Sequence, residues 1–520
     1  MTATERDADR HLLHVGRSRL RIEDLVALAE GRVEAALDPD PTYRAGLAAG
    51  SAAVERVLAC GQVIYGVSTG VGASLENTIP DELQRVLPLN LLRFHGCGTG
   101  RILEETEAAA VVAARLASLA RGYSGVRPVL LERLCEFLNL RLLPRIPAEG
   151  SVGASGDLTP LSYLAAALVG EREVTLRGAV LGAADALAQV GLAPLALAPK
   201  ESLALMNGTS VMTALGCLAF VRAVRLARWA AALTAVGCDV MRGNPAHFEA
   251  RIFDLKPHPG SRRCAAWIRE DLTRTEGGRP APPARLQDRY SLRCAPHVIG
   301  VLLDALDFSR SMIEIEVNGV NDNPIIDPES GDVFHGGNFY GGHVCFALDG
   351  LKAAVASVAD LLDRQLALLC DPATNGGLPA NLVAASGPER VAHHAFKAMQ
   401  ITASALAAEA LKLTMPASAF SRSTESHNQD KVSMGTIAAR DCLRVVELAE
   451  TVASIGTLAA CQGVDLRGGE ADALRSRALR DAVRKAVPQV LQDRRQDHDI
   501  SRVLELHAAG DLLGRDLDVR

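Results

Sequence analysis

Residues 150–160 read Gly150-Ser151-Val152-Gly153-Ala154-Ser155-Gly156-Asp157-Leu158-Thr159-Pro160, a run of small residues before the apolar stretch 161–169. Small residues allow sharp backbone bends. If the chain bends here, the amide nitrogen of Gly156 can attack the carbonyl carbon of Ala154 and close a five-membered ring. Loss of two waters, one of which takes the Ser155 hydroxyl, then leaves an exocyclic methylene. The product is an electrophile made without an external cofactor.

The same run is also typical of an ordinary helix N-terminus, with Ser155 or Asp157 as the capping residue. Two other interpretations fail on spacing. A nucleophile elbow requires Gly at the second position after the serine, where this chain has Asp157. A phosphate-binding loop requires Lys-Ser or Lys-Thr after its last glycine, and none of the glycine clusters has that pair. Cyclisation and helix capping therefore both stay open at this point.

The rest of the chain predicts a mainly helical, all-α fold. Apolar residues recur with helical spacing over long windows, and small alanine faces let such helices approach closely. The clearest windows are 201–240, 351–369, 392–413 and 436–460. We expect three parts: a smaller, loop-rich N-terminal region that carries the small-residue run, a long central helix bundle, and a charged helical tail. Their expected bounds are 1–200, 201–465 and 466–520.

Composition restricts the partners and the compartment. The chain has 55 Lys and Arg against 61 Asp and Glu, so it offers no basic surface for nucleic acid or for an acidic membrane. Its 11 cysteines are scattered singly without a C-x-x-C pair, which favours free thiols. The polar start 1–7 lacks the apolar core of a secretory signal, and three arginines interrupt the apolar stretch 215–240. We expect a cytoplasmic protein with a small-molecule partner, no nucleic acid and no membrane.

The run Ala154-Ser155-Gly156-Asp157 closely resembles the self-cyclising motif of the aromatic amino acid ammonia-lyase and aminomutase family, which includes histidine, phenylalanine and tyrosine ammonia-lyases. The resemblance continues in order and spacing over about residues 60 to 435. Its further motifs are YGVSTG at 65–70, MNGTS at 206–210, QDRYSLR at 287–293, NDNP at 321–324, GGNF at 336–339 and HNQD at 427–430.

The resemblance implies a helix bundle of the ammonia-lyase/fumarase-like type and a carbon–nitrogen lyase that works as a homotetramer, with active sites assembled from several subunits. It implies that Ala154, Ser155 and Gly156 form 4-methylidene-imidazole-5-one (MIO), with no external cofactor and no metal. Tyr65 matches the family's base on a mobile inner loop. A phenol of ordinary acidity is mostly protonated near neutrality, so local electrostatics must favour its phenolate.

The resemblance also assigns the substrate-binding side chains. Arg293 pairs with the substrate carboxylate, and Tyr290, three residues earlier, handles protons near the amine. Asn207 and Gln287 resemble amides that hold the electrophile's oxygen and the substrate. The remaining matches are Phe339 as an aromatic wall, Glu425 as a carboxylate near the amino group, and Gln429 as a further substrate-binding amide.

Substrate choice is expected to depend on Phe94 and His95, which align with the family's two-residue selectivity switch. The pair departs from the combinations usual for tyrosine, phenylalanine and histidine lyases. His95 can meet a phenol hydroxyl or an imidazole, whereas a plain phenyl ring leaves it unpaired. We therefore expect tyrosine to be converted to 4-coumarate, with phenylalanine and then histidine as alternatives.

Three other functions are compatible with parts of the sequence. A 2,3-aminomutase uses the same electrophile and returns the ammonia to the β-carbon. A non-catalytic helical assembly protein would keep the fold without the chemistry, but Tyr65, Ser155, Tyr290 and Arg293 are all present. Metal-dependent hydrolysis has little support, because the adjacent pair His393-His394 does not share a helix face.

Overall fold

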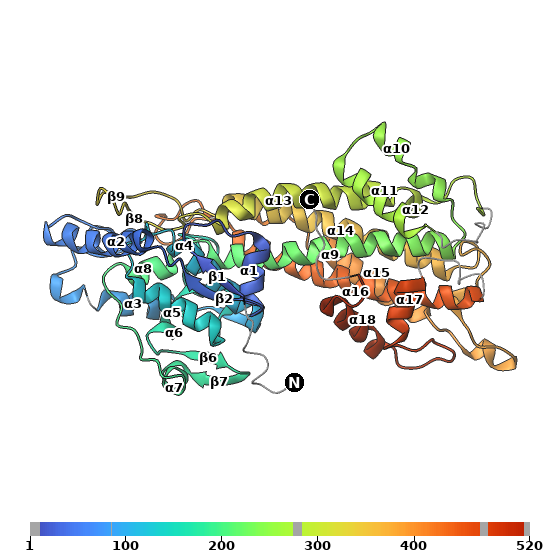
Figure 1. The fold of residues 1–520 in the computed structure, drawn as a ribbon, viewed down its shortest axis with the longest axis horizontal. Coiled ribbons are helices and arrows are strands. Elements are labelled where there is room, and N and C mark those ends of the chain that lie inside the picture. The colour runs from blue at the N-terminus through green and yellow to red at the C-terminus, as the bar shows by residue number, and fades with distance from the viewer. Residues whose placement is uncertain (1–10, 85, 274–282, 469–476, 514–520) are drawn as a thin grey trace. The chain divides into compact units, whose positions relative to one another are not determined.

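The computed structural model describes residues 11–84, 86–273, 283–468 and 477–513, and it is mainly helical, as the sequence predicts (Figure 1). The polar start of the chain lies outside these residues. Contacts divide the chain into two compact units. Unit 1 comprises Met1–Phe220, Ser309–Asp349 and Pro416–Arg440, and unit 2 comprises Val221–Phe308, Gly350–Met415 and Asp441–Arg520. This division cuts across the three parts expected from the sequence, which stay a prediction.

Unit 1 combines short helices with small sheets. β1 and β2 pair in parallel, β3 pairs with β5, β4, β6 and β7 form a three-stranded antiparallel sheet, and β8 pairs with β9. The strands are β1 (Leu12–Val15), β2 (Glu34–Leu37), β3 (Thr99–Ile102), β4 (Leu142–Pro144), β5 (Pro147–Glu149), β6 (Glu173–Leu176), β7 (Ala179–Gly182), β8 (Ile325–Ile326) and β9 (Val333–Phe334). The helices are α1 (Ile22–Ala29), α2 (Pro41–Ala59), α3 (Leu87–His95), α4 (Glu105–Leu119), α5 (Pro128–Asn139), α6 (Leu158–Leu168), α7 (Ala183–Gln189) and α8 (Glu201–Met206).

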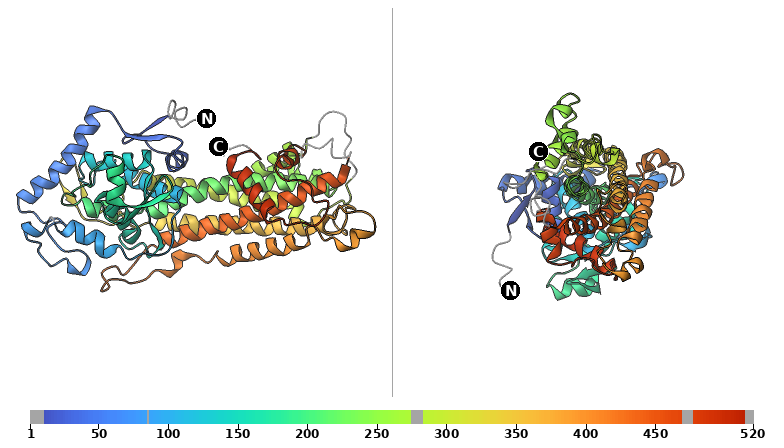
Figure 2. Two further views of the ribbon diagram at one scale, coloured as in Figure 1. Left: turned by 90° about the horizontal axis from the view of Figure 1, so that it is seen from below. Right: turned by 90° about the vertical axis from the view of Figure 1, so that its right-hand side faces the viewer.

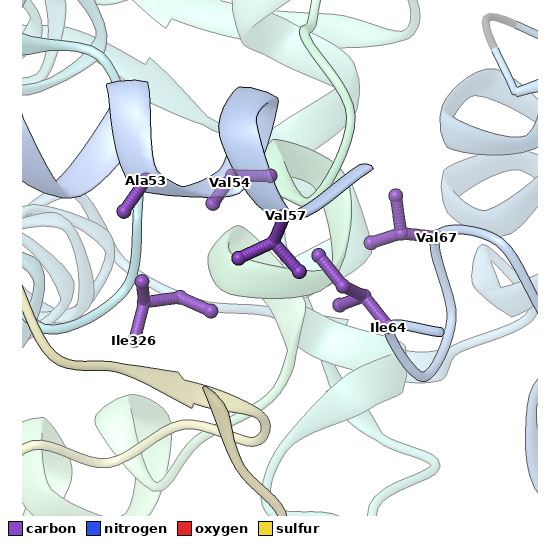
Figure 3. Packing of buried hydrophobic residues seen from close by; sticks show 6 residues of the cluster. All are labelled: Ala53, Val54, Val57, Ile64, Val67 and Ile326. Atoms are coloured by element: carbon purple, nitrogen blue, oxygen red, sulfur yellow. The ribbon is translucent and has the colours of Figure 1, made fainter. Parts of the chain in front are cut away.

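A small apolar cluster fixes the base of the loop that follows α2. Ile64 and Val67 on this loop are buried against Val54 and Val57 of α2 and against Ile326 of β8 (Figure 3). Each fully buried aliphatic side chain contributes about 1.5–3 kcal/mol. Because Ile64 and Val67 flank the intervening residues 65 and 66, the cluster holds this part of the loop in place.

Four long helices contribute residues to both units. They are α9 (Ser210–Val240), α13 (Ala295–Val317), α14 (Gly342–Cys370) and α16 (Gly435–Arg467). Within unit 2, their segments run side by side, as Figures 1 and 2 show. The buried Trp229 Nε1 of α9 donates to Thr457 Oγ1 of α16 at 2.9 Å, and Gln365 Nε2 of α14 donates to Thr234 Oγ1 of α9 at 2.9 Å. This is the helix bundle that the alanine-rich windows predict.

The remaining helices of unit 2 are α10 (Ala250–Asp254), α11 (Pro259–Asp271), α12 (Tyr290–Arg293), α15 (Lys397–Lys412), α17 (Arg477–Arg484) and α18 (Asp497–Ala509). α18 packs against the bundle, because His507 stacks on Trp229 at a ring-centroid distance of 4.0 Å. Of the helices in the described ranges, α9 is long and apolar enough to cross a membrane, but 83% of its apolar window is buried inside the protein. A buried core helix accounts for the same composition.

Candidate active site

A cavity of about 720 Å³ lies in unit 1, and all of its lining residues belong to that unit. Loops and helix ends build it: the loop after α2, the end of α3, the start of α6, the end of α8, and the loops before α14 and α16. Nine of the residues predicted for the site line this cavity: Tyr65, Phe94, His95, Ala154, Ser155, Asn207, Phe339, Glu425 and Gln429. Folding thus brings together residues that lie far apart in the sequence.

The tripeptide Ala154-Ser155-Gly156 lies at the cavity wall in a sharply bent backbone. Ser155 has φ 49° and Gly156 has φ 76°, both in the left-handed region. A Cβ at Gly156 would lie 2.1 Å from the Gly208 carbonyl oxygen, so only glycine fits. The neighbouring amide, Asp157 N–H, donates to that same oxygen at 2.7 Å. Tight bending and the lack of a side chain at Gly156 are what cyclisation of this tripeptide requires.

Asp157 holds the run in place but does not cap the helix it precedes. It occupies the N-cap position of α6, yet its side chain makes no bond to that helix. Its buried carboxylate instead accepts the amides of Val211 at 2.9 Å and Met212 at 3.0 Å, at the N-terminus of α9, and hydroxyls of Ser151 and Thr436. Burial nevertheless raises the pKa of Asp157, against the effect of these four hydrogen bonds.

Side-chain oxygens of Tyr65 and Glu425 both accept backbone amides of the loop after Tyr65. The Tyr65 hydroxyl oxygen accepts the Gly72 amide at 2.8 Å, and the Glu425 carboxylate accepts the Ala73 amide at 3.0 and 3.1 Å. Gly72 has φ 58°, and a Cβ there would lie 2.3 Å from a Glu425 oxygen. Glu425 therefore packs directly on the loop and also lines the cavity, and its expected place beside the substrate amine stays a prediction.

His95 presents a hydrogen-bond acceptor. Its Nδ1 lies 2.8 Å from the Leu91 carbonyl oxygen, and because a carbonyl can only accept, Nδ1 carries the proton. Burial lowers the pKa of His95, and the bond to Leu91 opposes this. The neutral ring then keeps a lone pair on Nε2. The Phe94 ring lies beside it, with a centroid distance of 4.1 Å.

Two amides are oriented by their other contacts. Gln429 accepts the Thr424 hydroxyl at 3.0 Å through Oε1, so its Nε2 points to Ser155 Oγ at 3.4 Å. Asn207 donates through Nδ2 to the Asn323 carbonyl at 2.7 Å, and its Oδ1 is buried without a partner in the described part of the chain. An unpaired buried acceptor beside a cavity is suited to a donor on a ligand.

Three predicted residues belong to the other unit. Gln287, Tyr290 and Arg293 belong to unit 2 and do not line the cavity. Tyr290 and Arg293 lie together, because the Arg293 guanidinium lies 4.7 Å from the Tyr290 ring centroid, and Arg293 also donates to the Asp288 carbonyl at 3.0 Å. Tyr290 is 71% exposed in the single chain. Tyr290 and Arg293 thus lie on the one short helix α12, and neither is among the residues that line the cavity within unit 1.

The cavity also includes side chains that the sequence interpretation did not assign. Asn323, Tyr340 and Lys431 all line it. Each lies inside or next to a motif used above, so adjacency to Pro324, Phe339 or Asp430 would have indicated them. Lys431 is the one Lys or Arg among the lining residues that the structure describes.

Within the described ranges, no three His, Cys, Asp or Glu side chains are grouped so as to hold a metal ion. The pair His393-His394 instead surrounds Asp493. The Asp493 carboxylate accepts the His394 amide at 2.8 Å, and the Asp493 amide donates to His393 Nδ1 at 3.2 Å. These contacts join a loop to the C-terminal segment and account for the pair structurally.

Known proteins resemble the chain over almost its whole length. The family model for aromatic amino acid lyases matches residues 20–486. A histidine ammonia-lyase from Aromatoleum aromaticum is 39% identical over 96% of this chain and 93% of its own length, and one from Gloeobacter violaceus is 40% identical over 95% of each. Among solved structures, a tyrosine aminomutase from Streptomyces globisporus has a TM-score of 0.89 at 35% identity and covers 98% of this chain and 100% of its own.

A solved histidine ammonia-lyase from Trypanosoma cruzi is similarly close, with a TM-score of 0.87 at 31% identity over 97% of this chain and 94% of its own. The motifs, the fold and these relatives agree. The chain is a carbon–nitrogen lyase and belongs to the aromatic amino acid ammonia-lyase and aminomutase family.

Proposed function

We propose that this enzyme eliminates ammonia from an aromatic L-amino acid whose ring carries a hydrogen-bond donor, giving the trans-arylacrylate. The observation that carries the proposal is the neutral His95, whose Nδ1–H is committed to Leu91 and whose Nε2 is left as an acceptor on a residue of the cavity wall. A tyrosine phenol and a histidine imidazole both supply a donor. Phenylalanine supplies none and would leave the acceptor unpaired.

The names of the similar proteins divide between histidine and tyrosine as the amino acid. Curated relatives named as histidine ammonia-lyases favour imidazole, so the expectation of tyrosine and 4-coumarate has no support from them. Solved structures named as tyrosine aminomutases favour the phenol. The proposal therefore specifies the ring donor, which both substrates share.

The bent tripeptide supports MIO as the electrophile of this enzyme, held by Gln429 at Ser155 and by the Gly208 carbonyl at the Asp157 amide. Such a group would supply an electron-poor methylene to the substrate. Tyr65 would take the benzylic proton. The Gly72 amide that points at its oxygen stabilises negative charge there, which a phenolate base requires.

We further propose that Gln287, Tyr290 and Arg293 complete the site from another subunit of a homotetramer. These residues do not line the cavity and Tyr290 is exposed in the single chain, and both observations support this. Mixing two inactive variants, Tyr65→Phe and Arg293→Met, tests it. If sites are shared between subunits, reassembled mixtures contain some intact sites and regain activity, whereas unshared sites stay inactive in every mixture. A cytoplasmic location stays our expectation, and the eleven cysteines, all of them thiols outside any disulfide and eight of them buried, agree with it.

The main test is an absorbance assay of arylacrylate formation with histidine, tyrosine and phenylalanine. We expect one of the first two to have the highest kcat/KM. Highest activity on phenylalanine would contradict the role given to His95.

A 2,3-aminomutase is the second candidate, because three of the similar solved structures are tyrosine aminomutases and another is a phenylalanine aminomutase. Chromatography of the same reactions decides between the two. A β-amino acid as the main product would identify a mutase, and an arylacrylate with free ammonia would identify a lyase.

A further inference from the structure

Two fully buried cations lie in unit 1 next to the segment that carries Asn207. Lys200 immediately precedes α8, and Asn207 immediately follows it. The Lys200 ammonium donates to Asp322 Oδ2 at 2.5 Å, and both side chains have 0% exposure. Arg115 of α4 is also fully buried. Desolvation lowers the pKa of both cations, so burying them is costly.

The Lys200–Asp322 pair is connected to the cavity through two hydrogen bonds. Asp322 Oδ1 accepts the Asn323 amide at 2.7 Å, and the Asn323 carbonyl accepts Asn207 Nδ2 at 2.7 Å. Because a carbonyl only accepts, it forces the Asn207 amide to present Nδ2 to Asn323. The Oδ1 of Asn207, a residue that lines the cavity, keeps no partner in the described part of the chain. The ion pair thus holds the group that orients Asn207.

Arg115 joins the same two segments a second time. Its guanidinium donates to the Ala204 carbonyl on α8 and, at 3.0 Å, to the Asn321 carbonyl. It also packs on the backbone of Gly208, where a Cβ would lie 2.1 Å from Nη1. The Gly208 carbonyl is the one that receives the Asp157 amide beside the cyclising tripeptide. Arg115 therefore fixes the turn that supports both Asn207 and Gly156.

A gain in stability is a weak reason for burying these charges, because replacing a buried ion pair with apolar residues is often neutral or stabilising. We propose that Lys200, Asp322 and Arg115 are positioning residues for the lyase reaction: they aim the Asn207 oxygen at the substrate and hold Gly208 against the electrophile-forming tripeptide. The inference rests on the proposed function, and it adds three residues that do not themselves line the cavity.

Two double variants separate positioning from stability. K200M/D322N and K200M/D322L both remove the two charges, and each leaves one buried donor unpaired, so their losses of stability should be similar. Only the asparagine variant keeps an oxygen that can accept the Asn323 amide. We expect its kcat to stay within about threefold of wild type. In K200M/D322L, we expect kcat to fall about 100-fold, since a misplacement near 1 Å has that effect.

Thermal unfolding, intact mass and kcat are measured on each protein. Equal kcat values for the two double variants would overturn the positioning role, whereas a wild type inactive on every aromatic amino acid would overturn the proposed function and the inference together. If K200M/D322L does not fold, Arg115→Lys gives the answer, because an ammonium cannot span the Ala204 and Asn321 carbonyls as the guanidinium does. An unchanged kcat in that variant would also contradict the inference.

Lys352→Met is the matched control. Lys352 is another fully buried lysine, 3.3 Å from Asp441, but it lies in unit 2 and does not line the cavity. We expect this control to lower the melting temperature without changing kcat of the folded enzyme. A loss of kcat as large as that of K200M/D322L would show that any buried lysine has the same effect and would refute the specific role.

Discussion

Replacing His95 should change which ring the enzyme prefers. In the wild type, Nε2 of the neutral His95 accepts a hydrogen bond from a ring donor and stays unpaired beside phenylalanine. His95→Leu removes the acceptor, so the donor of tyrosine or histidine becomes the unpaired group. Each unpaired buried polar group costs about 1–3 kcal/mol, so the two together give a combined change of about 2–6 kcal/mol. Because His95 is only half-buried, we expect the low end, about 2 kcal/mol or roughly 30-fold.

The assay compares kcat/KM for the better ring-donor substrate with kcat/KM for phenylalanine. The ratio should fall roughly 30-fold in His95→Leu, mainly because phenylalanine is accepted better and the ring-donor substrate worse. His95→Gln is the control, since its amide oxygen can still accept and should keep most of the preference. A ratio that changes less than about threefold in His95→Leu would refute the assignment of His95 as the ring-donor acceptor.

Three further outcomes follow from the contacts described. Gly156→Ala should abolish activity, because the added Cβ meets the Gly208 oxygen, and should leave the chain about 50 Da heavier than the mature wild type, about 36 Da for the two retained waters and about 14 Da for the added methylene; an intact mass about 36 Da lower than that would contradict this. Glu425→Gln should weaken the hold on the Ala73 amide by about 1 kcal/mol and raise protease cleavage after Gly72 roughly fivefold; equal cleavage rates would show that the carboxylate does not hold the loop. Burial lowers the pKa of His507 to about 3, so the unfolded chain takes up a proton below about pH 6.5 while the folded chain does not. The free energy of unfolding should therefore drop with falling pH, by about 2.7 kcal/mol from this residue at pH 4.5, and His507→Phe should remove that part in denaturant titrations; an identical pH dependence in both proteins would be the contrary result.

The fold class and the family were accessible from the sequence for a physical reason. Helical periodicity and alanine faces are local patterns, and they predicted helices at α9, α14 and α16, each with one end seven to nine residues away from the observed one. The small-residue run and its companion motifs are also local patterns, because a tight bend, an amide donor or the lack of a side chain depends on which residue occupies that position. Nine of the predicted site residues accordingly line one cavity.

The contacts of buried charged side chains are features that local sequence patterns do not predict. Lys200 and Asp322 are 122 positions apart in the sequence, and nothing near either of them indicates a partner. Glu425 comes 352 positions after Ala73, yet its carboxylate accepts the Ala73 amide. Asp157 fits a helix cap by sequence, yet its side chain bonds to the start of a different helix.

The sequence by itself determined which segments are helical, which residues can bend and cyclise, and which chemistry those residues can perform, since these properties depend on neighbours along the chain. Only the tertiary structure decided which oxygens and amides face one another: His95 Nδ1 toward Leu91, Asn207 Nδ2 toward Asn323, and Asp322 between Lys200 and the Asn323 amide. Hydrogen bonds between distant segments depend on distances of a few ångströms, and those distances are set only when the whole core has packed.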